Sequence, residues 1–474
     1  MAQIHDLTLL EQAAAIRNGE VSPVAITDHY LSRIDELNAS VGAYYTVTAD
    51  LAAEQARAAE ETVLKASNPS DLPPLTGVPI PVKDLNMYAG VRMTLGSEVF
   101  RDNIPDDDDY VVVRLKNAGS VLLGKTATPE FGLPCYTETT IGPPARTPWD
   151  PSRSAGGSSG GAAAAVAAGL APAAQGSDGG GSIRIPSSVC GLFGIKPTRG
   201  RISGGPLMPD LAGLSVNGPI ARTVADAALL LDVMSGNFPG DMYTLPALPA
   251  GESFLGYAGK PPGKLRIGRT RQGPVEGAVI HPDCVAAYDD ASDLLTSLGH
   301  DVEEISMPFG PDGVPFFEVL WYSYSTLAPI DPDDEGKLLP LTRYLRERGR
   351  ALGASELIFA QAYLQAVTRG ALAVMNQYDA ILTPTLALPP VPVGYFDEVE
   401  PAENFERQKL FTPFTAIFNI TGQPAVNVPL HWNSGGLPIG VMLAGRIGDE
   451  ATLISLSAQL EAARPWQERH PRLW

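Results

Sequence analysis

The sequence predicts an α/β fold in which a mixed or parallel β-sheet is covered by helices. Segments with helical periodicity alternate with short apolar strand patterns along the chain, and this alternation is typical of α/β proteins. Hydrophobic residues make up 44% of the 474 residues and charged residues 18%, as in globular proteins with a large buried core. Length alone would allow two or three domains. Because no Pro/Ser-rich or charged linker divides the chain, we expect a single unit.

The N-terminal part is predicted to be largely helical. Amphipathic patterns and an Ala- and Glu-rich composition predict three helices, at residues 8–18, 23–37 and about 49–67. The second has Ser22 as its N-cap and Pro23 at its first position, and both residues favour a helix start. The apolar segment LTGVPIPVKDL then predicts a short strand that ends on Lys83, and VVVRLKNAGSVLLGKT predicts a helix followed by a strand.

The C-terminal half continues the alternation. Helices are predicted in TVADAALLLDVMSG, PDCVAAYDDASDLLTSLG and LISLSAQLEAA, and strands in KLRIGRT, HDVEEI and YDAILTPT. A Pro- and Gly-rich stretch at 239–264 predicts a surface loop. The aromatic segment PFFEVLWYSYSTLAPI, from residue 315, fits either a core helix or a pocket wall, because aromatic clusters serve in both.

The charge of the chain argues against two classes of partner. The net charge is −19, from 34 basic and 53 acidic residues, and Asp106 to Asp109 form an acidic run that we expect to be a solvated loop. Such a surface repels nucleic acid and anionic lipid. The N-terminus lacks the basic start and apolar core of a signal peptide, and no apolar run approaches the ~20 residues of a membrane helix. We therefore expect a cytoplasmic protein that binds neither nucleic acid nor membrane.

No cofactor or metal site is expected. The three cysteines, Cys135, Cys190 and Cys284, are odd in number and lack metal-like spacing, which argues against a disulfide framework. The six histidines show no H-E-x-x-H spacing, so a metal hydrolase is poorly supported.

The most informative stretch is rich in Gly, Ser and small apolar residues and runs from Arg153 to Arg199. A flexible linker would stay polar, whereas GGSSGG leads directly into AAAAVAAGLAPAA, which could form a helix packed inside a core. A second turn, GSDGGGS, follows, so Ser158 and Ser182 lie 24 residues apart in two glycine turns. Glycine lets the backbone approach a ligand closely, and free N–H groups in such turns form anion-binding sites.

These motifs closely resemble the signature of the amidase signature family of serine amidohydrolases. GGSSGG, GSDGGGSIRIP and GIKPTRGR occur in order and at familiar spacing, and Lys83, in a segment similar to the family's lysine motif, lies 75 residues before Ser158. LTLLEQAAAIRNGEVSP, FNITGQPAVNVPL and GLPIGVMLAG resemble the family's flanking elements. The resemblance covers most of the chain. It implies one α/β/α unit, residues 1–474, with a central mixed sheet covered by helices. It is weakest at about 235–375, where we expect a variable insertion that contributes to the substrate pocket.

The resemblance implies a catalytic triad of Lys83, Ser158 and Ser182. A serine hydroxyl is a poor nucleophile until a base takes its proton, and a neutral lysine can be that base. For Lys83 to be neutral near pH 7, its pKa must be lowered by roughly 3 units, which corresponds to about 4 kcal/mol. Burial against the apolar GVPIPV segment could lower the pKa by this amount. Lys83 then draws a proton from Ser158 as Ser158 draws one from Ser182, which attacks the carbonyl carbon. Ser158 afterwards protonates the leaving nitrogen.

The family also implies the surroundings of this triad. The serine that corresponds to Ser158 follows a cis peptide bond. Backbone N–H groups of Ser182 and of three preceding residues would stabilise the oxyanion: Gly179, Gly180 and Gly181. Three further residues are implied as supports of this loop and of the two serines: Ser159, Asp178 and Arg184. Family members commonly carry a larger residue at the position of Gly179, so this glycine would either loosen the oxyanion hole or widen the acyl site.

Two other motifs are matched without their structural context. Gly119 to Thr126 satisfies the phosphate-loop pattern, but a helix precedes it and its interior predicts a strand, the reverse of what that motif needs. Gly157 to Gly161 satisfies the G-x-S-x-G elbow with Ser159 as nucleophile, and His281, His300 and His431 follow. A polar loop precedes this motif where the elbow requires a strand, so a Ser-His-Asp enzyme is the weaker alternative.

We therefore expect a cofactor-free hydrolase of neutral, apolar or aryl amides that acts through a Ser182 acyl-enzyme, with carbamates and esters as further substrates. FGLPCYTET and FFEVLWYSYS offer pocket walls and no arginine that would bind a carboxylate in bidentate fashion. The residues we expect in the pocket are Phe131, Cys135, Tyr136, Trp321 and Tyr322. Cys135 is expected to be a buried apolar side chain and not a second nucleophile. We expect a monomer or a homodimer.

Two rival functions share these motifs. The first is the glutaminase-type subunit of a tRNA-dependent amidotransferase, against which the charge of −19 and the lack of a basic stripe argue. It would prefer glutamine as its substrate. The second is a catalytically dead relative that only binds, and it would not react with a fluorophosphonate probe.

Overall fold

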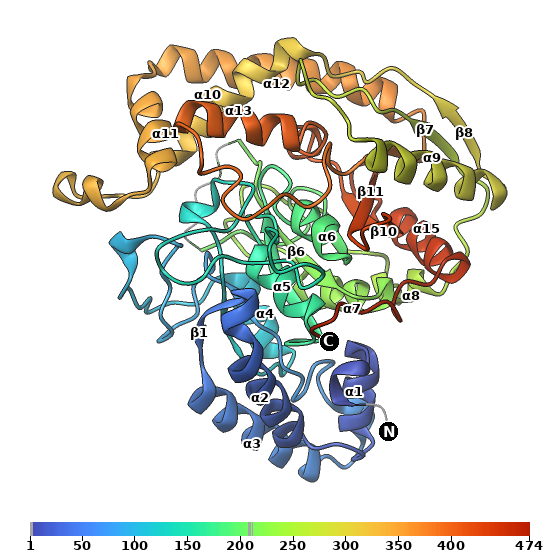
Figure 1. Ribbon diagram of the computed structural model, residues 1–474. Helices are drawn as coiled ribbons and strands as arrows, with labels where there is room; N and C mark the ends of the chain where they lie inside the picture. The colour runs from blue at the N-terminus through green and yellow to red at the C-terminus, as the bar shows by residue number, and fades with distance from the viewer. Residues whose placement is uncertain (1–2, 207–209, 211) are drawn as a thin grey trace.

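Helices and strands alternate along most of the chain, as predicted (Figure 1). The computed structural model describes residues 3–206, 210 and 212–474. The helices are α1 (Leu9–Arg17), α2 (Pro23–Val41), α3 (Ala49–Lys65), α4 (Tyr110–Asn117), α5 (Gly160–Ala167), α6 (Arg184–Cys190), α7 (Val224–Met234), α8 (Phe254–Ala258), α9 (Pro282–Ser297), α10 (Val314–Ser325), α11 (Pro340–Ala351), α12 (Ala354–Met375), α13 (Pro401–Phe411), α14 (Ile417–Ile420) and α15 (Glu450–Ala463). The strands are β1 (Tyr44–Val47), β2 (Val82–Lys83), β3 (Gly124–Thr126), β4 (Ala173–Asp178), β5 (Phe193–Lys196), β6 (Val216–Ala221), β7 (Arg266–Arg269), β8 (Asp301–Glu304), β9 (Ala380–Pro384), β10 (Ala425–Trp432) and β11 (Pro438–Gly445).

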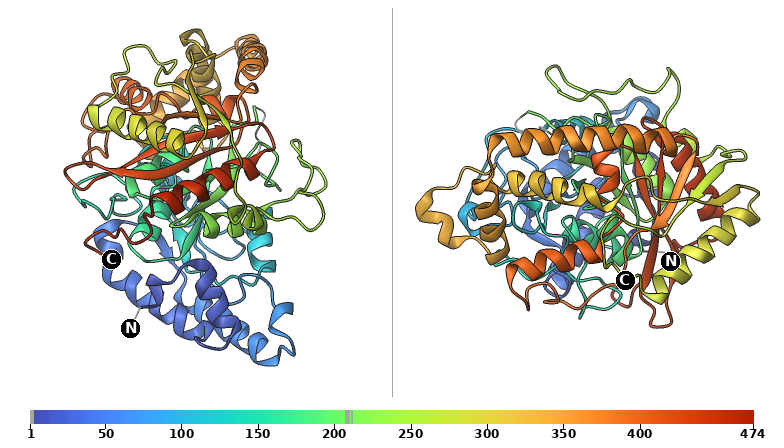
Figure 2. Two further views of the ribbon diagram at one scale, coloured as in Figure 1. Left: turned by 90° about the vertical axis from the view of Figure 1, so that its right-hand side faces the viewer. Right: turned by 90° about the horizontal axis from the view of Figure 1, so that it is seen from above.

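The central sheet is mixed. In the described part of the chain it has 8 strands in the order β4-β6-β5-β10-β11-β9-β7-β8. Neighbours from β4 to β9 are antiparallel, and β9, β7 and β8 run parallel. In Figure 2, left, α9 and α15 lie on the same side of these strands, and Arg464 at the end of α15 forms an ion pair with Asp290 of α9. α7 and α8 pack against α15. α6 covers the opposite face, because Gly440 of β11 lies against Ser188 of α6 whereas Gly445 lies against Leu453 of α15. This arrangement confirms the predicted α/β/α unit with a mixed sheet covered by helices.

A small second sheet holds Lys83. It has the order β1-β3-β2, and β3 lies antiparallel to β1 and parallel to β2. On β3, Lys125 is fully buried and forms an ion pair with Asp84, with 3.3 Å between Nζ and Oδ1. Lys125 is the lysine of the phosphate-loop pattern. Because α4 precedes this pattern and β3 ends it, the expectation that it is not a phosphate loop is confirmed. The ion pair instead fixes the residue next to Lys83.

The Ala-rich segment after Ser159 differs from its expected form. We expected a helix through AAAAVAAGLAPAA, but α5 ends at Ala167 and β4 begins at Ala173. Gly169 adopts a φ of 64°, which favours glycine and ends helices, and Pro172 has no N–H to continue the helix. The chain therefore turns back as a strand, which places Asp178 at the end of β4.

Three smaller expectations also change. The loop at 239–264 contains the short helix α8, whose first turn is capped by Ser253 Oγ, which accepts a hydrogen bond from Gly256 N–H at 3.0 Å. The acidic run is solvated only in part, because Asp109 is buried and accepts hydrogen bonds from Asn86 Nδ2 and Met87 N–H at 2.9 and 3.0 Å. The strand predicted in LTGVPIPVKDL is short, since regular pairing covers only Val82–Lys83.

One helix contradicts the expectation that no apolar segment approaches membrane length. By length and composition alone, α12 could cross a membrane. A single such helix is weak evidence for a membrane protein, because helices of soluble proteins meet the same criterion. In Figure 1, α12 lies with α10, α11 and α13 at the edge of the molecule farthest from both chain ends.

Candidate active site

Lys83 is fully buried at the end of β2. Its Nζ lies 2.7 Å from Ser158 Oγ and 3.0 Å from Ser177 Oγ. Burial lowers the pKa of Lys83 to about 7, although the nearby Asp178 carboxylate acts in the opposite direction. Desolvation disfavours the charged ammonium, so a substantial fraction of Lys83 is neutral near pH 7 and can accept a proton from Ser158.

The two serines of the glycine turns lie together. The peptide bond between Gly157 and Ser158 is cis, as the family resemblance implies. The N–H of Ser159, the next residue, donates to the carbonyl oxygen of Ser182 at 3.1 Å. Ser158 and Ser182 line the same cavity. The Ser182 hydroxyl makes no hydrogen bond to any other residue that the structure describes, so its oxygen is available to a substrate.

The glycine loop before Ser182 offers backbone donors. Among the described residues, the N–H groups of Gly179, Gly180 and Ser182 have no acceptor. The N–H of Gly181 instead donates to Asp178 Oδ1 at 2.8 Å. The expectation that Gly181 supplies an oxyanion donor is therefore wrong, because the Asp178 carboxylate already occupies that group. Three free donors remain beside the serine oxygen, which is enough for an oxyanion hole.

Asp178 and Arg184 hold this loop from behind. Both side chains are fully buried, with 2.9 Å between Arg184 Nη2 and Asp178 Oδ1. Burial acts to raise the pKa of Asp178, but Arg184, Lys196 and Asn419 together outweigh it and hold that pKa well below its ordinary value. The carboxylate also accepts from Ile183 N–H at 3.0 Å and from Asn419 Nδ2 at 2.9 Å. These bonds fix the backbone on both sides of Ser182.

Ser159 is a supporting residue and cannot be the nucleophile of an elbow. It is fully buried, and its hydroxyl donates to Ser177 O at 3.1 Å and accepts from Ser177 N–H at 3.2 Å. The histidines of that alternative have other partners: His300 bonds to Leu265 N–H and to Gln459, His281 caps α9, and His431 Nδ1 lies 3.8 Å from Asp290 Oδ2. The Ser-His-Asp alternative therefore lacks both a free serine and a histidine beside it.

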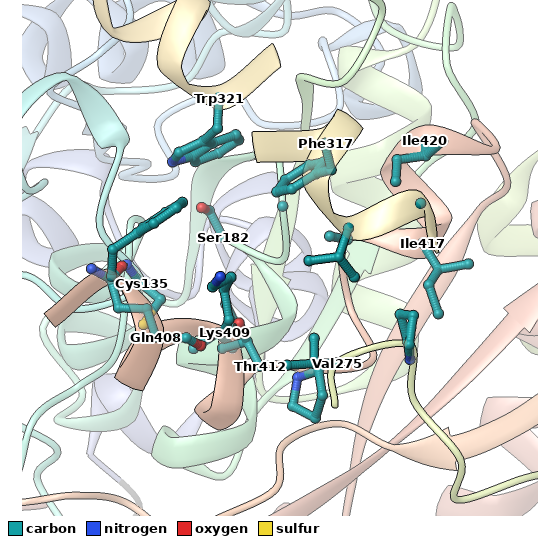
Figure 3. A pocket seen from close by; sticks show the side chains of 18 of the residues that line it. Cys135, Ser182, Val275, Phe317, Trp321, Gln408, Lys409, Thr412, Ile417 and Ile420 are labelled. Atoms are coloured by element: carbon teal, nitrogen blue, oxygen red, sulfur yellow. Dashed lines mark hydrogen bonds between the residues drawn. The ribbon is translucent and has the colours of Figure 1, made fainter. Parts of the chain in front are cut away.

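Two cavities meet at Ser182. The smaller, of about 90 Å³, is mostly apolar and is shown in Figure 3, where Trp321 and Phe317 lie on one side of Ser182 and Lys409 and Thr412 on the other. The larger, of about 640 Å³, is lined by Ser158 and Ser177 and also by the charged side chains of Arg199, Asp210 and Asp241. Ser182, Leu133 and Trp321 line both cavities.

The five predicted pocket residues divide into two groups. Phe131 lines the larger cavity, Cys135 the smaller, and Trp321 both. Burial raises the pKa of the Cys135 thiol well above its usual value, which fits an apolar wall. Tyr136 and Tyr322 line neither described cavity, so their assignment is wrong. Tyr136 is buried, stacks on Phe396 and donates to Asp397, while the Tyr322 ring packs on Phe405.

Several residues of the site are absent from the sequence-based predictions. On β4, Gln175 Oε1 accepts from Lys83 N–H at 2.8 Å and Ser177 Oγ accepts from Lys83 Nζ. Thr415 Oγ1 donates to Gly180 O at 2.6 Å. Gln175 and Ser177 are two apart on a strand, so they share a face, and this pattern could have indicated them once the strand was known. Thr415 follows from no local pattern, because it lies more than 200 residues from the loop that it supports.

No group of three or more His, Cys, Asp or Glu side chains that could hold a metal ion occurs within the described ranges. The buried lysine, the paired serines and the free backbone donors are the groups that acyl transfer to a serine requires. The model of the family described as Amidase matches residues 25–454. The chain therefore belongs to the amidase family, whose members carry the amidase signature.

Relatives match over almost the whole chain. A putative amidase, AmiB2, of Mycobacterium bovis is 38% identical over 97% of this chain and 96% of its own length. One subunit of the glutamyl-tRNA(Gln) amidotransferase of Thioalkalivibrio sulfidiphilus is 35% identical over 99% of both chains. Identity alone therefore does not separate an independent amidase from a component of an amidotransferase.

Solved structures agree with the fold. The structure of 6-aminohexanoate cyclic dimer hydrolase superposes with a TM-score of 0.90 at 32% identity and covers 100% of both chains. A bacterial aryl acylamidase of the amidase signature family superposes with a TM-score of 0.87 at 25% identity over 98% of both chains. The protein is thus similar to enzymes that hydrolyse C–N bonds.

Proposed function

We propose that this amidase cleaves neutral, apolar or aryl amides through an acyl-enzyme on Ser182. The observation that carries the proposal is a fully buried lysine with a pKa of about 7 whose Nζ lies 2.7 Å from Ser158 Oγ, while Ser158 lines the same cavity as Ser182. Neutral Lys83 takes the Ser158 proton as Ser158 takes that of Ser182, and Ser182 Oγ bonds to the carbonyl carbon. The N–H groups of Gly179, Gly180 and Ser182 stabilise the oxyanion.

Collapse of the tetrahedral intermediate requires a proton on the leaving nitrogen, because an amine leaves poorly as an anion. Ser158 supplies that proton and regains one from the Lys83 ammonium. In deacylation, water attacks the acyl carbon as its proton passes to Ser158 and the Ser158 proton passes to Lys83. When the bond to Ser182 Oγ breaks and the acid leaves, Ser158 returns a proton to Ser182 Oγ and regains one from the Lys83 ammonium. This cycle needs no cofactor. We propose that the enzyme performs it as a cytoplasmic monomer or homodimer.

The cations of the two cavities support a neutral substrate over glutamine. Arg199 donates to the carbonyl oxygens of Gly213, Asn419 and Ile420, so its guanidinium is engaged by backbone. Lys409, in the smaller cavity, pairs with Glu318 and Glu406. Neither offers the open bidentate clamp that the carboxylate of a free amino acid favours. The apolar wall of the smaller cavity suits an uncharged group instead.

Carbamates and esters fit the same chemistry. A carbamate presents a carbonyl between nitrogen and oxygen, and an ester has a better leaving group than an amide, so neither needs a residue beyond Lys83, Ser158 and Ser182. We propose both as additional substrates.

A substrate comparison tests the proposal. The kcat/KM of the purified wild type is measured for an anilide, an aryl carbamate, a nitrophenyl ester and glutamine, with Ser182→Ala as the matched control. We expect the anilide to exceed glutamine and Ser182→Ala to be inactive on all four compounds. If glutamine is the best substrate, the amidotransferase alternative is correct, and if only the activated ester reacts, the protein is not an amidase.

A further inference from the structure

The two cavities meet at the nucleophile with a single large side chain between them. Trp321 lines both, and a Cβ atom added at Gly180 would lie 3.5 Å from its ring, so the indole stands directly over the glycine loop. We infer that Trp321 divides a small acyl compartment from a large amine compartment, and that the preferred substrates are amides with a short aliphatic acyl group and a bulky amine. This inference rests on the proposed Ser182 acyl-enzyme.

The position of Ser158 assigns the two halves of the substrate. Ser158 must deliver its proton to the leaving nitrogen, so the amine half lies on its side of the carbonyl carbon. Ser158 lines the larger cavity and is absent from the wall of the smaller one. Gly179 also lines the larger cavity and Gly180 the smaller, so the oxyanion donors straddle the boundary. The amine half therefore occupies the larger cavity and the acyl half the smaller.

The volume of the smaller cavity limits the acyl group. At about 90 Å³, it is smaller than the roughly 150 Å³ cavity that holds benzene in another protein. A compartment smaller than one that holds benzene leaves room for a short aliphatic chain beyond the carbonyl and not for a phenyl ring. Phe309, Phe317 and Ile417 are part of its wall, which leaves little polar surface. Acetyl to butyryl groups fit this compartment, whereas hexanoyl and benzoyl groups exceed it.

The larger cavity accommodates the amine. Its volume of about 640 Å³ exceeds that of an aryl or naphthyl ring several times. Two carboxylates line it, Asp210 and Asp241, with Arg199 as the cation among the lining residues that the structure describes. Because two carboxylates and one guanidinium line the cavity, the net charge of its described wall is negative and favours a neutral or cationic amine half over an anionic one.

The neighbouring residue on α10 provides a matched control. Trp321 and Tyr322 are adjacent large aromatic residues, but Tyr322 lines neither cavity and reaches the smaller one only through Phe405, a wall residue on which it packs with ring centroids 5.7 Å apart. Truncation of either residue removes a comparable amount of packing from the same helix. Only truncation at Trp321 joins the two compartments, so a change in acyl preference that is confined to Trp321 isolates the dividing role.

The test measures kcat/KM for the p-nitroanilides of acetic, butyric, hexanoic and benzoic acids with wild type, Trp321→Ala and Tyr322→Ala. We expect the wild type to prefer butyryl over hexanoyl and benzoyl by about tenfold or more, the scale on which hydrophobic pockets discriminate single methylenes. Trp321→Ala should raise the hexanoyl-to-butyryl ratio by about tenfold, and Tyr322→Ala should leave it within about twofold. Trp321→Phe is a smaller truncation and should raise the hexanoyl-to-butyryl ratio by an intermediate amount. This variant replaces Trp321→Ala in the test if the alanine variant does not fold.

A second series fixes the acyl group as butyryl and varies the amine from ammonia to aniline and 2-naphthylamine, with benzamide as the reversed compound. The naphthylamide should be hydrolysed at least as well as the simple amide. A preference for benzamide over the butyryl naphthylamide, or equal effects of the two truncations, overturns the compartment assignment while the amidase function stands. If no compound of either series is hydrolysed, the proposed function itself fails.

Discussion

Lys83 shows how one buried side chain sets the conditions under which the enzyme works. Its pKa falls to about 7 because burial disfavours the ammonium, against the opposing effect of Asp178. Only the neutral amine can act as base. The neutral fraction therefore grows as the pH rises through 7, and below that value it falls about tenfold per pH unit.

This behaviour gives a pH prediction. The kcat/KM of the wild type for a neutral anilide should rise between pH 5.5 and pH 8 and level off above. Lys83→Ala should lose several orders of magnitude. Double replacement of Lys83 and Ser158 by alanine should be little worse than either single change, because residues that act as a unit are non-additive. An activity optimum below pH 6, or additive losses, would contradict a lysine base. A pH series with wild type and the three variants decides this.

Two glycines of the same loop should respond in opposite ways to one added methyl group. A Cβ at Gly179 would lie 3.8 Å from Trp321 and 3.9 Å from Ser215, which is ordinary contact, whereas at Gly181 it would lie 2.5 Å from Thr415 Oγ1. Gly181 also has a φ of 134°, a conformation that strains other residues. Gly179 thus adds space beside Trp321, and that space is not needed to form the loop.

We therefore predict that Gly179→Ala keeps kcat within about threefold on small amides, because the backbone donors stay in place. Gly181→Ala should lose about 100-fold or more, the scale expected when an oxyanion hole is distorted. Steady-state kinetics on one anilide compares the variants, and thermal melts show whether each is folded. Equal losses in two folded variants would contradict the assigned geometry of the loop.

At the scale of elements, the two glycine turns are fixed by their neighbours on both sides. The sequence motifs identified Lys83, Ser158 and Ser182, because glycine turns and their serines are local features. They did not identify Gly181 as a donor to Asp178, since the direction of an N–H depends on how β4 and α6 meet. The sequence AAAAVAAGLAPAA predicts one helix, whereas the structure has the end of α5 and the start of β4 there. Small apolar residues suit both a buried helix and a buried strand, so the pattern does not distinguish the two.

The contact between α7 and α15 carries a separate pH dependence. Glu461 on α15 accepts a hydrogen bond from Val224 N–H, at the start of α7, at 3.2 Å. Burial, together with the nearby Asp226, raises the pKa of Glu461 to about 7, against an ordinary value of 4.5. The folded protein therefore binds more protons than the unfolded chain between these two pH values, so this residue makes stability fall as the pH rises from about 4.5 to 7.

Glu461→Gln keeps the acceptor and removes the charge. We expect the variant to be more stable than the wild type by about 2 kcal/mol at pH 8 and equal to it near pH 4.5. Glu54 on α3 is exposed, so Glu54→Gln is the control and should leave the free energy of unfolding unchanged at both pH values. Urea unfolding at pH 8 and pH 4.5 measures the free energy of unfolding of each variant. If Glu461→Gln is less stable than the wild type at pH 8, the Glu461 carboxylate is charged and well solvated, which contradicts this prediction.

At the scale of the whole molecule, the cavities bring together segments that are distant in sequence. Leu133, Trp321 and Thr412 come from three separate regions of the chain. Aromatic content pointed to Trp321 and Tyr322 equally, and only the rotation of α10 against α13 decides which of the two faces Ser182. This is why the class of reaction is predictable from local motifs, whereas two of the five expected wall residues, Tyr136 and Tyr322, line neither cavity.

The central claim is that Ser182 forms the covalent acyl-enzyme, and labelling with a fluorophosphonate followed by peptide mass spectrometry tests it most directly. We predict one phosphonylated residue in the wild type, Ser182, with labelling unchanged in position in Ser159→Ala and abolished in Ser182→Ala. Lys83→Ala should be labelled at a rate at least about 100-fold lower, because the base is missing. Labelling on Ser159, or labelling that persists in Ser182→Ala, would contradict the account.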